Sequence, residues 1–187
     1  MKRKTIVIII IILFLTINTF SPLTFGINIK KYDNKNIIYK ETRINGNVLY
    51  VGGTGPNNYS HITYAFEDAN NNDTISVYNG IYYEFLRIYT SVKIIGESRE
   101  NTIINCLDKS DVIKISANNV KISGFTIDDA GQNFWRRVDA GIEITSNKNN
   151  IIIESNIIRN GYCGVFLQAS DNVTIKDNIF HSNNGPS

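Results

Sequence analysis

One segment of the chain gathers the residue types that bind or cleave sugars. It runs from Asp128 to Asp139 and contains the only tryptophan of the sequence, a phenylalanine, two arginines and three aspartates. Aromatic rings stack on sugar faces, and charged groups bind hydroxyls or uronate carboxylates. We therefore predict a carbohydrate-binding loop. Its predicted binding residues are Phe134, Trp135, Arg136, Arg137, Asp129 and Asp139.

Two carboxylates of this region have the chemistry to cleave a glycosidic bond as an acid and a base, namely Asp128 and Glu143. Glu143 is expected to point outward from the following strand, in a column with Arg87, Lys114 and Phe166. Three interpretations remain open: a surface loop whose tryptophan folds back over the fold, a sugar-binding loop, or a catalytic site. The sequence leaves enzyme activity undecided and favours a role without catalysis.

Short β-branched runs, separated by Asn, Gly, Ser and Asp, must position these residues. The runs fall into three sets that repeat along the chain. The first set comprises residues 85–88, 112–115, 141–144 and 164–167; the second 92–94, 120–122, 151–153 and 173–175; the third 75–77, 102–104, 125–127, 156–158 and 178–180. The step from Ile151 to Val173 is 22 residues. The step from Val120 to Ile151 is 31, because it contains the loop described above.

Three short strands per turn of about 22 residues predict an all-β fold, a parallel β-helix with turns stacked ~4.8 Å apart. Alternation along each strand places four apolar ladders inside. They are Leu86, Ile113, Ile142, Val165; Ile88, Ile115, Ile144, Leu167; Val92, Val120, Ile151, Val173; and Ile94, Ile122, Ile153, Ile175. Asn156 and Asn178 fall at one bend, where stacked amides can hydrogen-bond. The ladders explain the 33 isoleucines, and the bends explain part of the 26 asparagines.

The two ends of the predicted coil differ. Residues 60–69 have a helical pattern that is expected to cover the N-terminal end, with Ser60 as its cap. No comparable cap follows the last run, and the sequence stops at Ser187. We therefore expect the β-helix to be truncated here, with further turns or a partner at its C-terminal end.

The first 26 residues have the order of a secretory signal peptide. A basic stub, Met1 to Lys4, precedes an apolar run from Thr5 to Ile17, and the small-x-small triplet 24–26 follows. The run is 13 residues, shorter than the ~20 that a spanning helix needs. Cleavage is favoured over an uncleaved signal anchor, which would be the only membrane contact. The predicted organisation is a signal peptide at 1–26, a linker at 27–48 and a β-helix domain at 49–187, secreted or at the cell surface.

The charge of the chain belongs to the signal peptide. The whole sequence carries a net +2, and removal of three basic residues leaves 16 basic and 17 acidic side chains, a net −1. A nucleic-acid-binding domain normally carries its own basic patch, so no nucleic-acid partner is expected. The hydrophobic fraction of 42% also excludes ordinary disorder.

Several stretches resemble a known family. The segments 49–53, 73–84 and 92–97 look like the opening of right-handed β-helix surface proteins of the pectin-lyase-like superfamily. The Gly-Ile/Val and Asn-x-x-Ile-x-x-Asn turns after residue 140 resemble NosD-like repeats of the carbohydrate-binding and sugar-hydrolase type. The resemblance implies a right-handed β-helix outside the cytoplasm with a polysaccharide-related role. It does not specify activity, because such coils occur in lyases, hydrolases, epimerases, adhesins and a copper-site maturation protein.

We expect no metal site and no cofactor. His61 and His181 fall at opposite ends of the predicted coil, and the exported part lacks methionine, whereas soft metals need such ligands gathered together. No aspartate column that would hold Ca²⁺ beside a positioned base is recognisable. Cys106 and Cys163 fall about two turns apart, ~10 Å, beyond the Cα separation of a disulfide, and are expected to be free thiols.

Together these features predict an exported β-helix module that binds a polysaccharide or surface glycan, or that serves as an adhesive scaffold. The alternative is a polysaccharide lyase or glycoside hydrolase of the same fold. A purely structural role within a larger surface protein is the third possibility.

Overall fold

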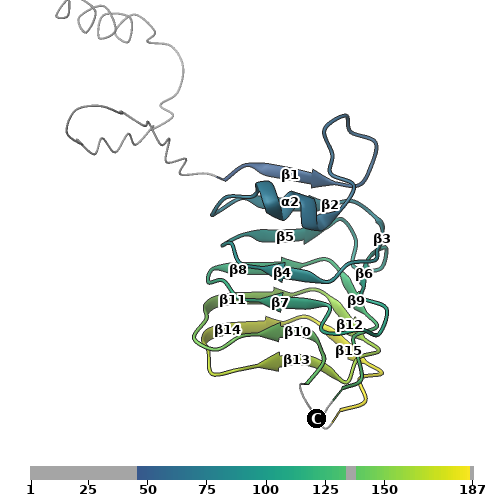
Figure 1. Ribbon diagram of the computed structural model, residues 1–187, viewed down its shortest axis with the longest axis vertical. Helices are drawn as coiled ribbons and strands as arrows, with labels where there is room; N and C mark the ends of the chain where they lie inside the picture. Colours follow the sequence, from purple (N-terminus) through teal and green to yellow (C-terminus); the bar gives the residue numbers. More distant parts are fainter. Residues whose placement is uncertain (1–45, 134–137, 186–187) are drawn as a thin grey trace, which may run out of the picture. The chain divides into compact units, whose positions relative to one another are not determined.

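The computed structural model describes residues 46–133 and 138–185, and within them every strand pairs with its neighbours in parallel. The strands form three parallel sheets, which together make up the coil (Figure 1). A six-stranded sheet contains β1 (Val48–Val51), β2 (Thr74–Val77), β5 (Lys93–Gly96), β8 (Val120–Ser123), β11 (Asn149–Glu154) and β14 (Asp171–Lys176). A four-stranded sheet contains β4 (Leu86–Ile88), β7 (Ile113–Ile115), β10 (Ala140–Ile144) and β13 (Cys163–Leu167). A five-stranded sheet contains β3 (Gly80–Tyr82), β6 (Thr102–Asn105), β9 (Thr126–Asp128), β12 (Ile157–Arg159) and β15 (Ile179–His181).

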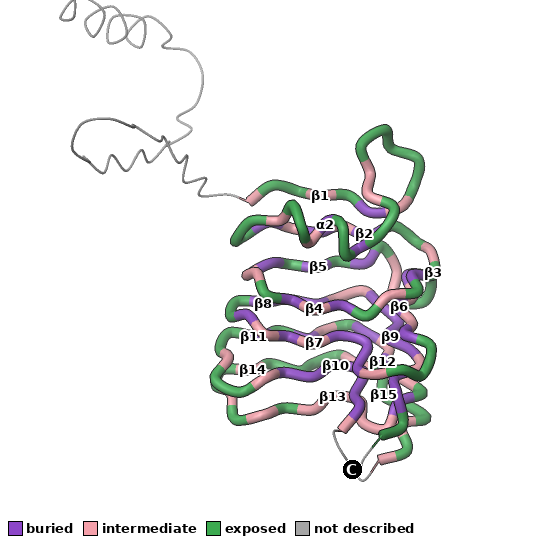
Figure 2. Tube along the Cα trace, viewed as in Figure 1, coloured by how far each residue is buried: buried purple, intermediate pink, exposed green. Residues whose placement is uncertain are grey.

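The inner ladders are those expected from the repeat. Leu86 aligns with Ile113, Ile113 with Ile142, and Ile142 with Val165. The ladder through Ile122 and Ile153 aligns in the same way. The inner residues of the middle turns are fully buried, and Figure 2 shows buried residues following the strands through the coil. A stacked β-branched side chain packs on its equivalents above and below, so the repeat itself builds the core.

Asparagines stack at the bend between the six-stranded and five-stranded sheets, as predicted. Asn156 is fully buried, and its amide nitrogen donates to the carbonyls of Ile122 and Glu154. Its side-chain oxygen accepts from the backbone nitrogen of Phe125 at 3.1 Å. Asn178, one turn later, accepts from the Asn156 backbone and side chain in the same way. Each amide therefore satisfies backbone groups that the bend would leave unpaired.

The bends account for a second share of the asparagines. Twelve described residues other than glycine have a positive φ, and six of them are asparagine while three are aspartate. These two residue types tolerate the left-handed conformation better than other side chains do. Three such asparagines, Asn119, Asn150 and Asn172, also form an exposed ladder of side-chain hydrogen bonds where β8, β11 and β14 begin.

The first turn departs from the predicted repeat. Residues 75–77 were assigned to the third set of runs, but β2 pairs with β1 and β5 and so belongs to the six-stranded sheet. The third set begins instead with β3, which pairs with β6. The prediction was wrong because the segment 78–91 makes an irregular first turn, whose spacing differs from the 22-residue step.

The helix α2 (Ile62–Asp68) covers the N-terminal end of the coil, with Ile62 and Ala65 fully buried. Its N-cap is His61, not Ser60 as the sequence predicted, and the His61 side chain makes no capping hydrogen bond. The orphan amides of the first turn are satisfied by Glu84, which a local motif cannot reveal. At the other end, the inner residues Leu167 and Ile175 are 44% and 41% exposed.

The predicted signal peptide and nearly all of the predicted linker lie outside the described residues, and the described body belongs to the unit Asn45–Ser187. The first strand begins at Val48, one residue before the predicted domain start. Among the described residues, the only helix that appears is far too short to cross a bilayer.

Replacement of Asn156 by alanine is expected to destabilise the fold by about 3 kcal/mol, because it removes the acceptor of the Phe125 amide and a donor to the carbonyls of Ile122 and Glu154. Urea unfolding followed by circular dichroism measures the loss. Asn149→Ala is the matched control, because this asparagine is exposed on β11, and it should change stability by less than about 0.5 kcal/mol. Equal losses in the two variants would show that the stacked amide is not a principal support of the bend.

Candidate functional site

The loop predicted to bind sugar is closed at its base by one of its own aspartates. Asp139 is buried, and its carboxylate accepts a hydrogen bond from the backbone nitrogen of Asn133 at 3.0 Å. The Asp139 nitrogen donates in return to the Asn133 carbonyl. A Cβ at Gly131 would lie 2.3 Å from a carboxylate oxygen of Asp139, so a larger residue there would displace this carboxylate. Asp139 therefore holds the two ends of the loop together.

The remaining predicted binding residues divide into two groups. Asp129 occupies the bend after β9 with a φ of 62°, and its carbonyl accepts from the backbone nitrogen of Asp108. Its backbone therefore joins the loop to the preceding turn. The other four residues lie outside the described residues, and their role stays a prediction. They are Phe134, Trp135, Arg136 and Arg137.

The two candidate catalytic carboxylates lie on different sheets, each with its own cation. Asp128, on β9, accepts from Arg159 at 2.8 Å and from the Asn160 amide at 2.8 Å, and the bond to Asp128 raises the pKa of Arg159. Glu143, on β10, accepts from Lys114 at 2.6 Å and from Gln168 at 2.8 Å. Both oxygens of each carboxylate therefore have protein donors, an arrangement that favours binding turns together over proton transfer to a substrate.

The column predicted on the outer face of the four-stranded sheet is present. Arg87 aligns with Lys114, Lys114 with Glu143, and Glu143 with Phe166. Glu143 points away from the core as expected, but it is only 3% exposed. The ion pair with Lys114 and the bond from Gln168 compensate for this burial.

Three ion pairs join the same two turns, one on each sheet. They bridge the 31-residue step in which the loop is inserted, because β7, β8 and β9 belong to one turn and β10, β11 and β12 to the next. The pairs are Lys114–Glu143, Lys121–Glu154 and Asp128–Arg159. Each bridge lies between adjacent strands of its sheet, so the insertion leaves the stacking of the coil intact.

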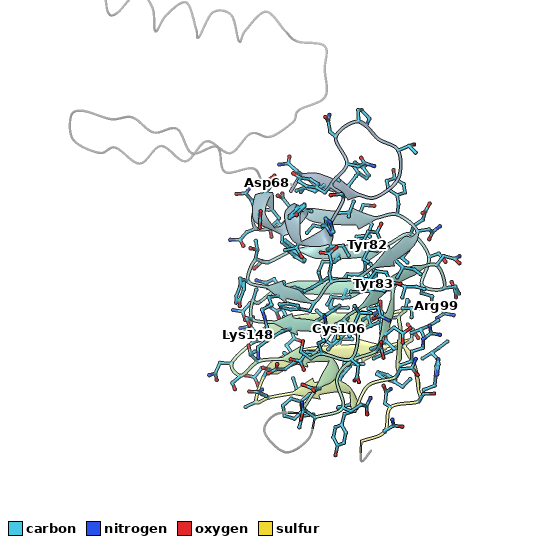
Figure 3. All side chains as sticks on the ribbon, turned by 45° about the vertical axis from the view of Figure 1, so that its right-hand side comes forward. Asp68, Tyr82, Tyr83, Arg99, Cys106 and Lys148 are labelled. Atoms are coloured by element: carbon cyan, nitrogen blue, oxygen red, sulfur yellow. The ribbon has the colours of Figure 1, made fainter. Side chains whose placement is uncertain are left out.

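A hollow of the described structure lies elsewhere, in a groove that was not predicted from the sequence. This groove, of about 770 Å³, lies between α2, the segment 83–90 that contains β4, and the loop 105–109. We call it the α2–β4 groove. In Figure 3, Tyr83 from the second segment and Cys106 from the third lie on the same flank of the coil.

Exposed rings dominate the α2–β4 groove. Tyr64, Tyr83, Phe85 and Tyr89 are 51%, 63%, 52% and 70% exposed, and all line it. Strand alternation explains part of this arrangement, because Phe85 and Tyr89 point outward beside inward residues of β4. The run Tyr82-Tyr83-Glu84-Phe85 was the available signal in the sequence, but its contact with α2 follows only from the fold.

Two cations also line the groove. The guanidinium of Arg87 lies 4.8 Å from the ring centre of Phe85, in a cation–π contact. Lys109 reaches the groove from the loop after β6. Neither side chain forms a salt bridge within residues 46–133 and 138–185, so both positive charges are available to a ligand.

No group of three or more His, Cys, Asp and Glu side chains in the described part of the chain is arranged to hold a metal ion. Cys106 and Cys163 are both free. Cys106 is buried with its thiol near the carbonyls of Ser110 and Asp129, and burial raises the pKa of the Cys163 thiol. The α2–β4 groove therefore offers rings, two cations and polar groups to a ligand, together with the carboxylates of Glu67 and Glu84.

The stacked sheets define a parallel β-helix solenoid, with an aromatic groove on one flank. The chain belongs to the family described as the right handed beta helix region, whose model matches residues 68–187. This match covers the repeat in general, and the finer likeness to NosD-like repeats stays a prediction.

A similar solved structure is pectin methylesterase PemA from Erwinia chrysanthemi, with a TM-score of 0.50 and 16% identity. The alignment covers 74% of this chain and 48% of that enzyme, so the chain spans about half the enzyme's length. At this identity the likeness shows the fold alone, a right-handed parallel β-helix of the pectin-lyase-like type. No curated protein sequence matches the chain significantly.

The Glu154 carboxylate should make stability depend on pH. Hydrogen bonds from Lys121 and Lys176 hold its pKa below the usual 4.5. A carboxyl whose pKa is lower in the folded state stabilises the fold above its unfolded pKa, and this stabilisation is lost as the pH falls through the folded value. Glu154→Gln should therefore lower the urea midpoint at pH 7 and have progressively less effect between about pH 4.5 and pH 3.

Glu67→Gln is the control for this experiment, because Glu67 forms no ion pair among the described residues. Its urea midpoint should follow that of the wild type at every pH. A Glu154→Gln deficit that persists unchanged at pH 3 would contradict the ionic origin of the effect.

Proposed function

We propose that this protein is an exported β-helix module that binds carbohydrate in the α2–β4 groove. The observation that carries the proposal is a cluster of four exposed aromatic rings around one groove. Rings of this kind offer apolar faces to the C–H faces of sugars, while neighbouring polar groups bind hydroxyls. Thr90 and Asn105 supply such groups in the groove lining.

The cations of the groove favour a glycan with acidic groups. Arg87 and Lys109 carry positive charges with no carboxylate partner among the described residues. A guanidinium binds a carboxylate or sulfate through parallel hydrogen bonds, and partial enclosure strengthens such a contact. Glu67 adds one exposed carboxylate to the lining, while Glu84 is committed to α2, so the two cations still favour a uronate-bearing or sulfated surface polysaccharide over a neutral one.

Fold and sequence support the same general role at a coarser level. The relationship of the fold to pectin methylesterase favours a carbohydrate-related function, and the predicted signal peptide favours action outside the cell. An adhesive scaffold is compatible with this proposal, because an adhesin holds its partner without turning it over.

The alternative function is a polysaccharide lyase or glycoside hydrolase. One observation favours it. Arg87 lines the groove and also begins the outward column that contains Lys114 and Glu143. A substrate that extends from the groove along the coil axis would pass the carboxylate of Glu143 and the basic side chains of Arg87 and Lys114. The ion pair between Lys114 and Glu143 is the argument against it, because a proton donor or acceptor must be available to the substrate.

Removal of groove rings should weaken glycan binding. A glycan array followed by calorimetry on the best acidic oligosaccharide measures the affinity. Tyr83→Ala and Phe85→Ala are each expected to reduce it about tenfold, because a stacked aromatic side chain contributes roughly 1–1.5 kcal/mol. Affinity should also fall as salt rises, since the groove cations attract the acidic groups.

Tyr50→Ala is the matched control for these variants. Tyr50 is 44% exposed and stacks on Tyr78, yet it does not line the groove. Its affinity should equal that of the wild type. If Trp135→Ala abolishes binding while the groove variants retain it, the site lies in the loop 128–139 and the groove assignment is wrong.

Turnover distinguishes the binding protein from the enzyme. Incubation with acidic polysaccharides should release neither reducing ends nor unsaturated uronates. Release that persists through purification and disappears in Asp128→Ala or Glu143→Ala would replace the binding proposal with the enzyme.

A further inference from the structure

The helix α2 both closes the end of the coil and forms one wall of the α2–β4 groove. It lies beside β4, which is the edge strand of the four-stranded sheet, and it contacts β1, β2 and β4 (Figure 1). Its inward residues Ile62 and Ala65 are fully buried and close the end of the coil. Its outward residues, among them Tyr64 and Glu67, line the α2–β4 groove. The position of the helix therefore sets the shape of the groove.

The residues of α2 do not by themselves stabilise the helix in this position. It has seven residues, its N-cap side chain makes no capping hydrogen bond, and its first turn contains no acidic residue. A helix of this length is unstable alone, because nucleation costs more than so few bonds return. Some other group must satisfy its first amides.

Glu84 satisfies those amides from 22 residues away. One carboxylate oxygen accepts from the Ile62 nitrogen at 2.9 Å, and the other accepts from the Thr63 nitrogen at 2.9 Å. The Thr63 hydroxyl donates to the second oxygen at 2.6 Å, and Nδ1 of His61 lies 3.4 Å from the first. The Glu84 side chain is only 7% exposed. Both oxygens are thus committed to the start of α2.

The same residue belongs to the opposite wall of the groove. Glu84 lies between Tyr83 and Phe85, which are among its exposed rings. On α2, the bonded segment carries His61 and Tyr64, whose rings meet edge to face at 4.9 Å. Glu84 is therefore next in sequence to the rings of Tyr83 and Phe85, while its carboxylate holds the segment of α2 that bears the other two rings.

We propose that Glu84 is a positioning residue of the groove, which fixes the distance between the rings of α2 and those of the segment 83–90. The groove then grips a single soluble glycan chain between two ring-bearing walls, rather than lying flat on an extended polysaccharide surface. This inference rests on the proposed function and adds to it the form of the ligand and the residue that sets the fit.

Glu84→Gln tests the proposal, because glutamine keeps the size of the side chain but has one acceptor oxygen in place of two. Hydrogen exchange should accelerate at the Ile62 and Thr63 amides and remain unchanged in the ladders of the coil. Affinity for the soluble acidic oligosaccharide should fall about tenfold or more, as expected for lost hydrogen bonds to a charged group. Wild-type protein should bind the oligosaccharide and should not sediment with the insoluble form of the same polysaccharide.

The control and the rescue separate positioning from general stability. Glu97→Gln removes a carboxylate that also accepts one backbone hydrogen bond, from Asn79 at 2.8 Å, but that does not line the groove. It should leave affinity unchanged. His61→Asp in the Glu84→Gln background places a local N-cap on α2. Compared with Glu84→Gln alone, this double variant should regain amide protection and part of the affinity. His61→Asp alone is the reference for the effect of the new side chain.

The outcomes distinguish glycan binding by the groove from the positioning of α2 by Glu84. Wild-type protein that binds no glycan overturns the proposed function, whereas amide exchange decides by itself whether Glu84 holds α2. Unchanged exchange in Glu84→Gln, or full affinity despite faster exchange at α2, overturns the positioning role. If Glu84→Gln does not fold, the double variant with the restored cap supplies the same comparison. Co-sedimentation of wild-type protein with the insoluble polysaccharide overturns the single-chain ligand.

Discussion

Parallel backbone pairing between successive turns is the constraint on which the rest of the structure depends. Each residue lies opposite its equivalent one turn earlier, so side chains at equivalent positions form a column along the coil. Inner columns must be apolar, because no water reaches them, and β-branched residues pack best on their own copies. Outer columns are free to carry charge. The same register that builds the core therefore decides which polar side chains meet.

The polar residues that resemble catalytic groups are explained by this register. An acid on one turn and a base at the equivalent place on the next are brought together whether or not a substrate is bound. On the four-stranded and five-stranded sheets such a pair joins the step that contains the loop 128–139, and on the six-stranded sheet Lys121 pairs diagonally with Glu154. These pairs are partly buried, so desolvation offsets part of their attraction. Asp128 and Glu143 therefore each have a structural role in joining neighbouring turns.

The predictable part of the fold is the part that repeats. Leu86, Ile113 and Ile142 were placed in one inner ladder from their spacing alone, and Asn156 was placed on Asn178, because an error of one residue would turn every side chain to the wrong face. The cap of α2 and the strand pairing of residues 75–77 were not predicted. Both depend on contacts that occur once, in a turn with no copy of itself to compare.

The groove lies at this irregular end for a physical reason. A regular coil presents flat sheets and narrow bends, and the α2–β4 groove arises where a helix replaces a strand. At the N-terminal end α2 occupies the place beside β4 that a further strand would take, and a helix is wider than a strand. The edge of β4 needs a cover, since an open apolar edge invites association with other chains. The need to close the solenoid thus places a helix with its own exposed rings beside the rings of β4, and a concave aromatic site follows from the capping of the fold.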